Sequence, residues 1–567
     1  MTRPQKIRLG EILVQQKLIS EEQLLQALAD QKRSGRKLGR VFVENGYVTE
    51  ETISGALARQ LNIPYINLKQ YNLKPQTVQM LPEMQARRFR VIALEDRPNA
   101  LLIGMADPTD LFAYDEIARV TRRNLALAVV NEQELLQAID RMYRRTEEIT
   151  VLARELEQEL GDNVIDFGTL GLSAGAEDAP VVRLLQTVFD DATQVRASDI
   201  HIEPQEKRLQ IRFRIDGMLH LQTEADIRIA PALALRLKLM SDLDIAEKRL
   251  PQDGRFAVTV RKQLIDVRIS TMPTQFGESV VMRLLNQSGG ILDLSNIGMP
   301  SNILQRFRSI IQRPNGLVLV TGPTGSGKTT TLYGALSEIN TEGKKLITVE
   351  DPVEYRLPGI NQVQVNEKIN LDFARVLRSA LRQDPDIVLV GEMRDQETAQ
   401  IGLRAAMTGH MVLSTLHTND AASTPLRLLD MGVPHYMVGS SLQAVLAQRL
   451  VRVVCDNCAE PYPLLPNERE WLKGELKDTV DAHEYKHGVG CSYCNGTGFR
   501  GRTGIYEMLE MTREVAAAAN RSDPAEFVQL AQQQMGGQTL RRHAVALVLA
   551  GKTTVSEAMR VTTQLDD

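Results

Sequence analysis

The chain has 567 residues, of which 43% are hydrophobic and 24% are charged, so a mostly disordered or collagen-like protein is excluded. At roughly 100–200 residues per domain, this length predicts three or four domains. The formal net charge of −4 argues against binding to nucleic acid along the whole chain. Because no run of 18 apolar residues occurs and the N-terminus is charged, we expect a cytosolic protein without a transmembrane helix or signal segment.

The first sixty residues contain an internal duplication. Residues 8–31 read RLGEILVQQKLISEEQLLQALADQ, and residues 37–60 read KLGRVFVENGYVTEETISGALARQ. Each copy predicts two short amphipathic helices, the second capped by Ser20 or Thr49. The duplication is either a packing module or a ligand site. A ligand is favoured because a cation beside a glycine can approach a phosphate, and a terminal glutamine can hydrogen-bond a base edge.

This pattern closely resembles the paired cyclic-di-GMP motifs of MshEN domains. The resemblance implies a first half-site formed by Arg8, Leu9, Gly10 and Gln31. It implies a second half-site formed by Lys37, Leu38, Gly39 and Gln60. Around the ligand it places Leu24, Leu28, Ile53 and Leu57. A lysine cannot form the planar bidentate fork of an arginine, so the second half-site is expected to be weaker or to play a different part.

The rest of the N-terminal region predicts a small α/β unit that fits the second half of an MshEN domain. Its expected strands are 64–68, 91–94 and 100–105, and its expected helices are 111–121 and 132–145. We therefore place a first domain at 1–150. The polar segment 151–178 predicts a linker.

A phosphate-binding loop is the strongest motif of the chain. Residues 322–329, GPTGSGKT, fit G-x-x-x-x-G-K-[ST] between an apolar strand and a helix. Backbone N–H groups of such a loop hold phosphates, while Lys328 adds charge at the β- and γ-phosphates and Thr329 offers a hydroxyl to Mg²⁺. The residues expected to hold ATP are Gly322, Pro323, Thr324, Gly325, Ser326, Gly327, Lys328, Thr329 and Thr330.

Three further apolar runs end in residues whose side chains can take part in catalysis or bind a metal ion. Residues 386–392 end in Glu392, which a parallel sheet would place beside the phosphate loop, where it could hold a metal water or polarise the attacking water. The run from 347 ends in Glu350 and Asp351. His417 closes another run, where a γ-phosphate sensor is favoured over a structural histidine.

These four segments together resemble the secretion ATPase superfamily of GspE and PilB, where they form the Walker A motif, the Asp box, a Walker B motif with Gly before Glu, and the His box. The resemblance implies an α/β multidomain fold with a PAS-like N2 domain at 179–290 and a RecA-like ATPase core at 291–567. It also implies a homohexamer with ATP between the two domains. Arginines of the N2 domain approach the phosphates in that family. Arg255 and Arg268 match these segments, with Arg212 and Arg214 as competing candidates.

All four cysteines lie in two C-x-x-C pairs, formed by Cys455, Cys458, Cys491 and Cys494. In a reducing compartment such pairs favour a structural, tetrahedral Zn²⁺ over a redox pair or unmetallated packing. With four protein ligands no coordination position stays open, so catalysis at the metal is not expected. The same insertion occurs in GspE and PilB-type ATPases, and the resemblance suggests that it helps couple the ring to its membrane partner.

The leading prediction is a cytoplasmic hexameric ATPase that extends an MSHA-type pilus at the inner face of the bacterial inner membrane. It would act on an inner-membrane platform protein, use ATP, Mg²⁺ and Zn²⁺, and respond to cyclic-di-GMP. The type II secretion ATPase is the alternative, because it shares these motifs; pilus retraction is less favoured. A DNA translocase or helicase is disfavoured by the 4% aromatic content. A scaffold without turnover is disfavoured because Lys328, Thr329 and Glu392 are all present.

Overall fold

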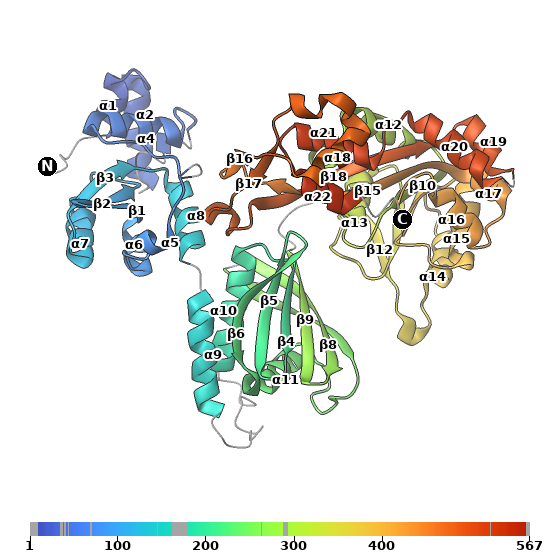
Figure 1. Ribbon diagram of the computed structural model, residues 1–567, viewed down its shortest axis with the longest axis horizontal. Coiled ribbons are helices and arrows are strands. Elements are labelled where there is room, and N and C mark those ends of the chain that lie inside the picture. The colour runs from blue at the N-terminus through green and yellow to red at the C-terminus, as the bar shows by residue number, and fades with distance from the viewer. Residues whose placement is uncertain are drawn as a thin grey trace.

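The computed structural model has an α/β multidomain fold and describes residues 9–34, 38, 41–42, 45–68, 71–143, 146–160, 180–261, 263–286, 293–521 and 523–562. Figure 1 shows three parts, which follow one another along the chain. Arg8, Lys37 and Gly39 of the predicted cyclic-di-GMP site lie outside the described residues. Within the described ranges, no helix combines the length and apolar character that a membrane crossing requires.

The N-terminal repeat forms helices whose predicted caps are confirmed. Its helices are α1 (Leu9–Gln15), α2 (Glu21–Ser34) and α4 (Glu50–Leu61). The Ser20 hydroxyl accepts a hydrogen bond from the backbone N–H of Gln23 at 3.2 Å. The Thr49 hydroxyl accepts one from the N–H of Thr52, also at 3.2 Å. Both bonds satisfy N–H groups that a helix start leaves unpaired, so the two copies begin their second helix in the same way.

A three-stranded sheet in the order β1-β2-β3 follows the repeat. The strands are β1 (Val91–Arg97), β2 (Ala100–Met105) and β3 (Leu125–Val129). The helices are α5 (Pro75–Val78), α6 (Glu83–Phe89), α7 (Leu111–Thr121) and α8 (Glu132–Met142). The strand expected at 64–68 is wrong, because this segment makes only an isolated bridge from Tyr65 to Val129. Pro64, which has no N–H to donate, limits its pairing.

The N2 domain is a six-stranded antiparallel sheet in the order β6-β5-β4-β9-β8-β7. Its strands are β4 (Asp199–Pro204), β5 (Arg208–Ile215), β6 (Met218–Asp226), β7 (Gln252–Val260), β8 (Gln263–Thr274) and β9 (Gly277–Asn286). Its helices are α9 (Thr146–Leu160), α10 (Pro180–Gln194) and α11 (Ala230–Met240).

Helix α9 departs from the predicted linker. Residues 151–160 are helical rather than linking, and Leu152 and Leu156 are buried in the same core as Leu184 and Leu233. The amphipathic pattern of the helix explains the difference, because its apolar stripe needs a partner and finds one on the N2 domain (Figure 1). The N2 domain therefore includes a helix that precedes residue 179.

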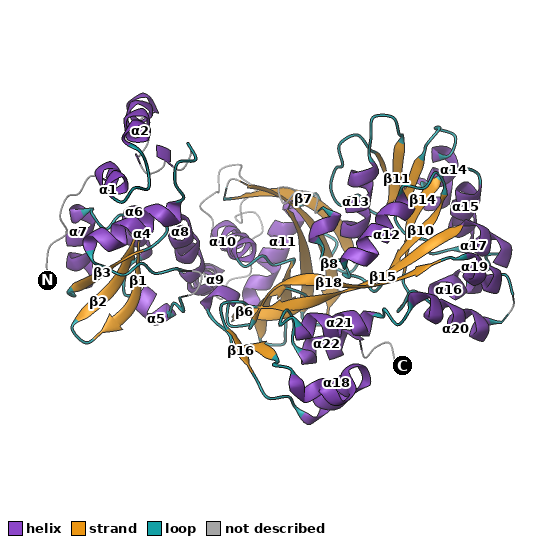
Figure 2. Cartoon of the chain, turned by 90° about the horizontal axis from the view of Figure 1, so that it is seen from above, coloured by secondary structure: helices purple, strands orange, loops and turns teal. Residues whose placement is uncertain are grey.

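The ATPase core is a seven-stranded sheet in the order β12-β11-β13-β14-β10-β15-β18, parallel except for the β15–β18 pair. The strands are β10 (Gly316–Thr321), β11 (Leu346–Glu350), β12 (Asn361–Gln364), β13 (Ile387–Val390), β14 (Met411–Leu416), β15 (Leu442–Val454) and β18 (Phe499–Glu510). The helices around it are α12 (Ser301–Ile311), α13 (Lys328–Ile339), α14 (Phe373–Ala380), α15 (Gln396–Met407), α16 (Thr424–Asp430) and α17 (His435–Ser441). Figure 2 shows these helices on both faces of the sheet. This cover explains why the central strands are apolar throughout.

The C-terminal region covers one end of the core sheet. It contains β16 (Ala459–Pro461), α18 (Pro466–Leu476), β17 (Lys486–Gly488), α19 (Arg513–Ala519), α20 (Pro524–Met535), α21 (Leu540–Leu549) and α22 (Val555–Thr562). Glu557 on α22 receives hydrogen bonds from the Arg452 backbone at 3.1 Å and from its guanidinium at 2.7 Å. This contact fastens the last helix to β15.

Candidate functional site

The phosphate loop joins β10 to α13 as the motif predicts. Gly322, Gly325 and Gly327 all have positive φ, at 140°, 79° and 88°. A Cβ at Gly322 would lie 2.3 Å from a backbone oxygen of β15, so only glycine fits there. The loop opens into the N-terminus of α13, whose free N–H groups and dipole favour an anion.

Lys328, the first residue of α13, turns back over the loop. Its Nζ donates to the Gly322 oxygen at 2.8 Å and to the Pro323 oxygen at 3.1 Å. Burial lowers the pKa of Lys328, while the negative charge of Glu392 opposes that shift. The ammonium group is therefore held at the mouth of the loop, beside a carboxylate.

A cavity of about 860 Å³ lies over the loop and takes in most of the predicted site residues. From the predicted ATP set it is lined by Thr324, Gly325, Ser326, Gly327, Lys328, Thr329 and Thr330. Glu350, Asp351, Glu392, His417 and Arg268 line it as well. Gly322 and Pro323 do not, and contribute the carbonyl oxygens that accept from Lys328. The cavity is large enough for a nucleoside triphosphate. Its cationic side chains can pair with the phosphates, and its carboxylates can bind a metal ion.

Glu392 and His417 meet at the carboxyl edge of the sheet. Glu392, which follows β13, forms an ion pair with Arg394 at 2.5 Å. Its other oxygen lies 3.7 Å from Nε2 of His417, which follows β14. Burial and the charge of Lys328 lower the pKa of His417, so its ring is neutral near pH 7. A carboxylate and a neutral imidazole are therefore available on the same side of the cavity.

Glu350 lines the same cavity but has uncharged partners. Its carboxylate accepts hydrogen bonds from the hydroxyls of Tyr333 and Thr348 and, at 3.3 Å, from Nε2 of Gln362. Burial and the nearby carboxylate raise the pKa of Tyr333, so its phenol stays protonated and continues to donate. Tyr333 was not predicted from the sequence. It follows the loop motif on α13, and only the fold brings it to Glu350.

A row of arginines on the N2 sheet faces the core. Arg255, Arg268 and Arg283 are cross-strand neighbours on β7, β8 and β9. Arg268 donates to the Val353 oxygen at 3.0 Å and pairs with Glu354 at 3.0 Å. Burial and the two flanking arginines lower the pKa of Arg268, whereas Glu354 opposes that shift. Arg283 pairs with Asp199 at 3.1 Å, so carboxylates partly offset the repulsion between these neighbouring arginines.

The predicted arginines fall into two groups. Arg268 lines the cavity, whereas Arg255, Arg212 and Arg214 do not. Arg212 pairs with Glu203, and Arg214 lies 3.7 Å from Asp199. The cavity is lined instead by three arginines that sequence reasoning missed, which are Arg283, Arg394 and Arg502. A signal existed for Arg394, which stands two residues after Glu392. No local pattern marks the other two.

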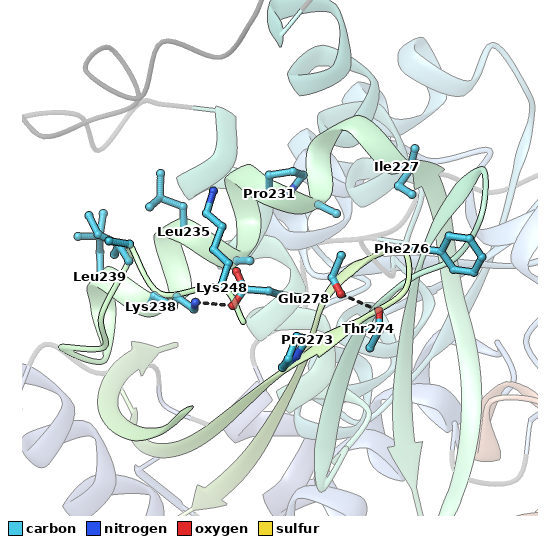
Figure 3. A pocket seen from close by; sticks show the side chains of 15 residues that line it. Ile227, Pro231, Leu235, Lys238, Leu239, Lys248, Pro273, Thr274, Phe276 and Glu278 are labelled. Carbon is cyan, nitrogen blue, oxygen red and sulfur yellow. Dashed lines mark hydrogen bonds and ion pairs between the residues drawn. The ribbon is translucent and has the colours of Figure 1, made fainter. Parts of the chain in front are cut away.

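A second cavity, of about 640 Å³, lies in the N2 domain between α11 and the turn from β8 to β9. Figure 3 shows Lys238 paired with Glu278, and apolar residues that include Leu235 and Phe276 line the same cavity. The Lys238 ammonium also donates to the Glu247 oxygen at 2.7 Å. This lysine is already satisfied within the protein, and the cavity lacks the loop and the strand-end carboxylates of the first one.

The four cysteines gather into one buried cluster. Their Sγ atoms all lie within 4.8 Å of one another, and three of the separations are 3.8 Å. A tetrahedral ion with Zn–S bonds of about 2.3 Å would place the sulfurs about 3.8 Å apart, so the cluster fits Zn²⁺. None of the four is in a disulfide. Cys494 Sγ also accepts from the backbone N–H groups of Cys491 and Gly498, each at 3.2 Å, which favours a thiolate.

The described part of the predicted cyclic-di-GMP site combines packing and exposed residues. Gly10 is buried, and a Cβ there would lie 2.3 Å from Cδ1 of Leu24, so a larger residue would force the Leu24 side chain to move. Leu57 belongs to the core of the repeat, against which Leu24, Leu38 and Ile53 pack. Leu28 and Gln60 are exposed, and Gln31 is half-buried. The structure describes α1 from Leu9 onward but not the side chain of Leu9.

This arrangement of loop, strand-end carboxylate and domain-bridging arginine defines a P-loop ATPase, and comparisons with known proteins agree. The family described as "Type II/IV secretion system protein" matches residues 174–560, and the MshEN domain family matches residues 61–149. The chain is 41% identical to the type IV pilus assembly ATPase PilB of Myxococcus xanthus, covering 97% of this chain and 98% of that one. It is 40% identical to the type II secretion system protein E of Xanthomonas campestris pv. campestris, covering 99% of each.

Among solved structures, the ATPase DotB of Legionella pneumophila matches with a TM-score of 0.51 and 21% identity, covering 67% of this chain and 96% of that one. This likeness concerns the fold alone. The chain belongs to the type II/IV secretion system protein family and is an ATPase of the secretion and pilus assembly group.

Proposed function

We propose that this protein is a cytoplasmic, homohexameric ATPase that powers extension of an MSHA-like type IV pilus under the control of cyclic-di-GMP. It acts at the inner membrane on a platform protein of the pilus machine. The observation that carries the proposal is the cavity to which both the core and the N2 domain contribute side chains. A reaction at that cavity changes the contacts of both domains, and such a change is what a motor needs.

We assign the roles in ATP hydrolysis from the motifs and from the cavity that most of these residues line. Lys328 neutralises charge on the β- and γ-phosphates, and the Thr329 hydroxyl binds Mg²⁺. Glu392 orients and polarises the attacking water, Glu350 supports the same reaction from the neighbouring strand end, and His417 senses the γ-phosphate. Arg268 stabilises charge on the transferred phosphoryl group, and Arg255, its cross-strand neighbour outside the cavity, adds positive charge behind it.

The type II secretion ATPase stays the alternative function. Relatives from the two systems are 41% and 40% identical to this chain over nearly its whole length, so identity does not separate them. The deciding experiment replaces the native gene with a Glu392→Gln version in the source bacterium and counts surface pili and secreted proteins. We expect pili to disappear while secretion continues. Loss of secretion with normal pili would assign the protein to the secretion system instead.

Control by cyclic-di-GMP is proposed from the N-terminal repeat. The half-sites are Arg8, Leu9, Gly10 and Gln31, and Lys37, Leu38, Gly39 and Gln60. The MshEN family match over residues 61–149 supports the assignment, because it lies directly after the repeat. A ligand can bias the motor only if its affinity differs between conformations of the ring.

Calorimetric titration of the full chain with cyclic-di-GMP tests this control. We expect submicromolar binding that weakens at least tenfold in Arg8→Ala and stays unchanged in Arg3→Ala, a matched control outside the repeat. No binding by the folded protein would reduce the repeat to a packing module. Sedimentation of Glu392→Gln with ATP and Mg²⁺ tests the ring, which should have six times the mass of the 63.3 kDa chain. A persistent monomer would contradict it.

A further inference from the structure

Gln448 lies beneath the phosphate loop and takes no part in the reaction described above. It stands on β15, next to β10, just beyond the pair formed by Thr321 and Ala447. Only 1% of its surface is exposed. Its Nε2 donates to the backbone oxygen of Ser326 at 2.8 Å, and its Oε1 accepts from the Thr331 hydroxyl at 2.7 Å. One buried amide therefore ties the loop and the first turn of α13 to the neighbouring strand.

Two glycines of the phosphate loop pack directly against Gln448. A Cβ at Gly322 would lie 2.3 Å from the Gln448 backbone oxygen. A Cβ at Gly327 would lie 3.2 Å from the Gln448 Nε2. The loop thus rests directly on the glutamine, and side chains at these two positions would push it away.

The hydrogen bond to Ser326 sets the direction of a phosphate donor. The Ser326–Gly327 peptide is trans, since the cis bond found in the described residues is Asp351–Pro352. In a planar trans peptide the C=O and the following N–H point in opposite directions. Because the Ser326 carbonyl points toward Gln448, the Gly327 N–H points in the opposite direction, away from Gln448. Gly327 has a φ of 88°, and a glycine could otherwise turn this peptide at little cost.

We propose that Gln448 is a positioning residue that keeps the Gly327 N–H directed at the phosphates of the bound nucleotide. The inference rests on the proposed ATP site and adds a residue that lies outside the loop motif. Gln448 touches neither nucleotide nor metal. It acts through the Ser326–Gly327 peptide, so its loss should weaken phosphate binding more than it weakens the fold.

The test compares ADP affinity in three full-length variants, because ADP reports on phosphate binding without turnover. Gln448→Met keeps the length and burial of the side chain but removes both hydrogen bonds, and we expect the Kd for ADP to rise about tenfold. Gln448→Glu keeps an acceptor for Thr331 but removes the donor to Ser326, and we expect a similar rise. Thr331→Val is the matched control, since it spares the Ser326 bond, and its Kd should stay within about twofold of the parent.

Thermal unfolding of each variant separates positioning from simple destabilisation. Gln448→Met takes the Gln448 partner from both the Ser326 oxygen and the Thr331 hydroxyl, whereas Thr331→Val takes a partner only from the Gln448 Oε1. We therefore expect Tm to fall in both variants, further in Gln448→Met, while the Kd for ADP rises in Gln448→Met alone. Equal weakening of ADP binding in the two, or an unchanged Kd in Gln448→Met, would overturn the role of Gln448. A parent protein that binds no ADP, or a Lys328→Ala variant that binds it normally, would instead contradict the ATP site itself.

Discussion

The environment of His417 predicts how the ATPase activity depends on pH. Burial and the charge of Lys328 keep the pKa of His417 below its ordinary value of 6.5. The ring is therefore neutral at pH 7.5 and becomes charged only as the pH falls below that ordinary range. A charged ring would pair more strongly with Glu392, 3.7 Å away, and draw the carboxylate from its proposed water.

We accordingly expect ATPase activity to fall at a pH below 6.5, and the acid limb of the pH profile should follow the titration of one group. In His417→Asn, which cannot be protonated, kcat should be lower at every pH and this acid limb should be absent. Steady-state kcat measured from pH 5.5 to 8.5 for both proteins checks the expectation. If the variant keeps the same acid limb, another group titrates there.

Glu557 shows how a single carboxylate can fasten an element. Burial alone would raise the pKa of Glu557, but hydrogen bonds from Arg560 and Arg452 outweigh it and lower the pKa to about 2 from an ordinary value of 4.5. A carboxyl group with a depressed folded pKa stabilises the fold above its unfolded pKa and loses this contribution as the pH falls toward the folded value. The attachment of α22 to β15 should therefore weaken between pH 4.5 and 2.

Glu557→Gln should lower the free energy of unfolding of the core by about 2 kcal/mol at pH 7, because it removes the charge from two arginine contacts. The difference from the parent should shrink as the pH falls below 4.5, where the parent carboxylate begins to gain a proton. Urea unfolding at several pH values measures it, with the exposed Glu514→Gln as the control. A difference that is constant down to pH 3 would rule out the charge as its cause.

The cysteine cluster makes a prediction about metal content. Four thiolates at tetrahedral spacing should bind about one Zn²⁺ per chain, and elemental analysis of the purified protein measures this directly. Cys494→Ser should lose the ion, and its Tm should fall, because a structural metal stabilises the segment that it closes. Zinc retained in full by Cys494→Ser would show that the ion is bound elsewhere.

Elements with strong local patterns could be predicted from the sequence. The loop of 322–329 lies between the expected strand and helix, and Glu392 and His417 stand at strand ends as parallel packing requires. Polar residues dominate segment 151–178 and predict a linker, although its first third, the last ten residues of α9, carries an apolar stripe. Over only ten residues, the helical periodicity of apolar side chains is a weaker signal than the polar composition of the whole segment.

Residues that act through partners distant in the sequence could not be predicted from the local sequence pattern. Arg283 and Gln448 each lie on a strand whose sequence carries no known motif, and their importance depends on what the sheet order places beside them. The cross-strand row from Arg255 through Arg268 to Arg283 exists only because β7, β8 and β9 pair in one register. Register depends on turns and packing across the whole sheet, so spacing along the chain could not reveal it.

Among the described residues, Arg268 and Asp216 of the N2 domain both bind residues of the core. Arg268 binds Glu354 and the Val353 oxygen, while Asp216, at the turn between β5 and β6, accepts from the Gly501 N–H at 2.8 Å. Asp216 also lies 3.8 Å from Nε of Arg502, which lines the cavity together with Arg268. If hydrolysis moves the domains, the contact at Arg268 is the one made directly by an N2 side chain that lines the cavity.

Arg268→Ala should therefore lower kcat at least tenfold, because a half-buried guanidinium that lines the cavity is removed. Asp216→Ala, which loosens the second contact without removing a cavity residue, should change kcat less than threefold. ATP hydrolysis by the assembled full-length protein measures both. Equal losses in the two variants would mean that domain attachment, rather than the arginine charge, controls turnover.

The most direct test of the central claim, that this cavity hydrolyses ATP, measures ATP binding and turnover in Glu392→Gln. Removing the carboxylate charge at the end of β13 should spare the phosphate loop, so the Kd for ATP should stay within about twofold of the parent. The same change should lower kcat about 100-fold or more, because the attacking water loses its polarising group. Turnover at the parental rate would place the reaction elsewhere in the molecule.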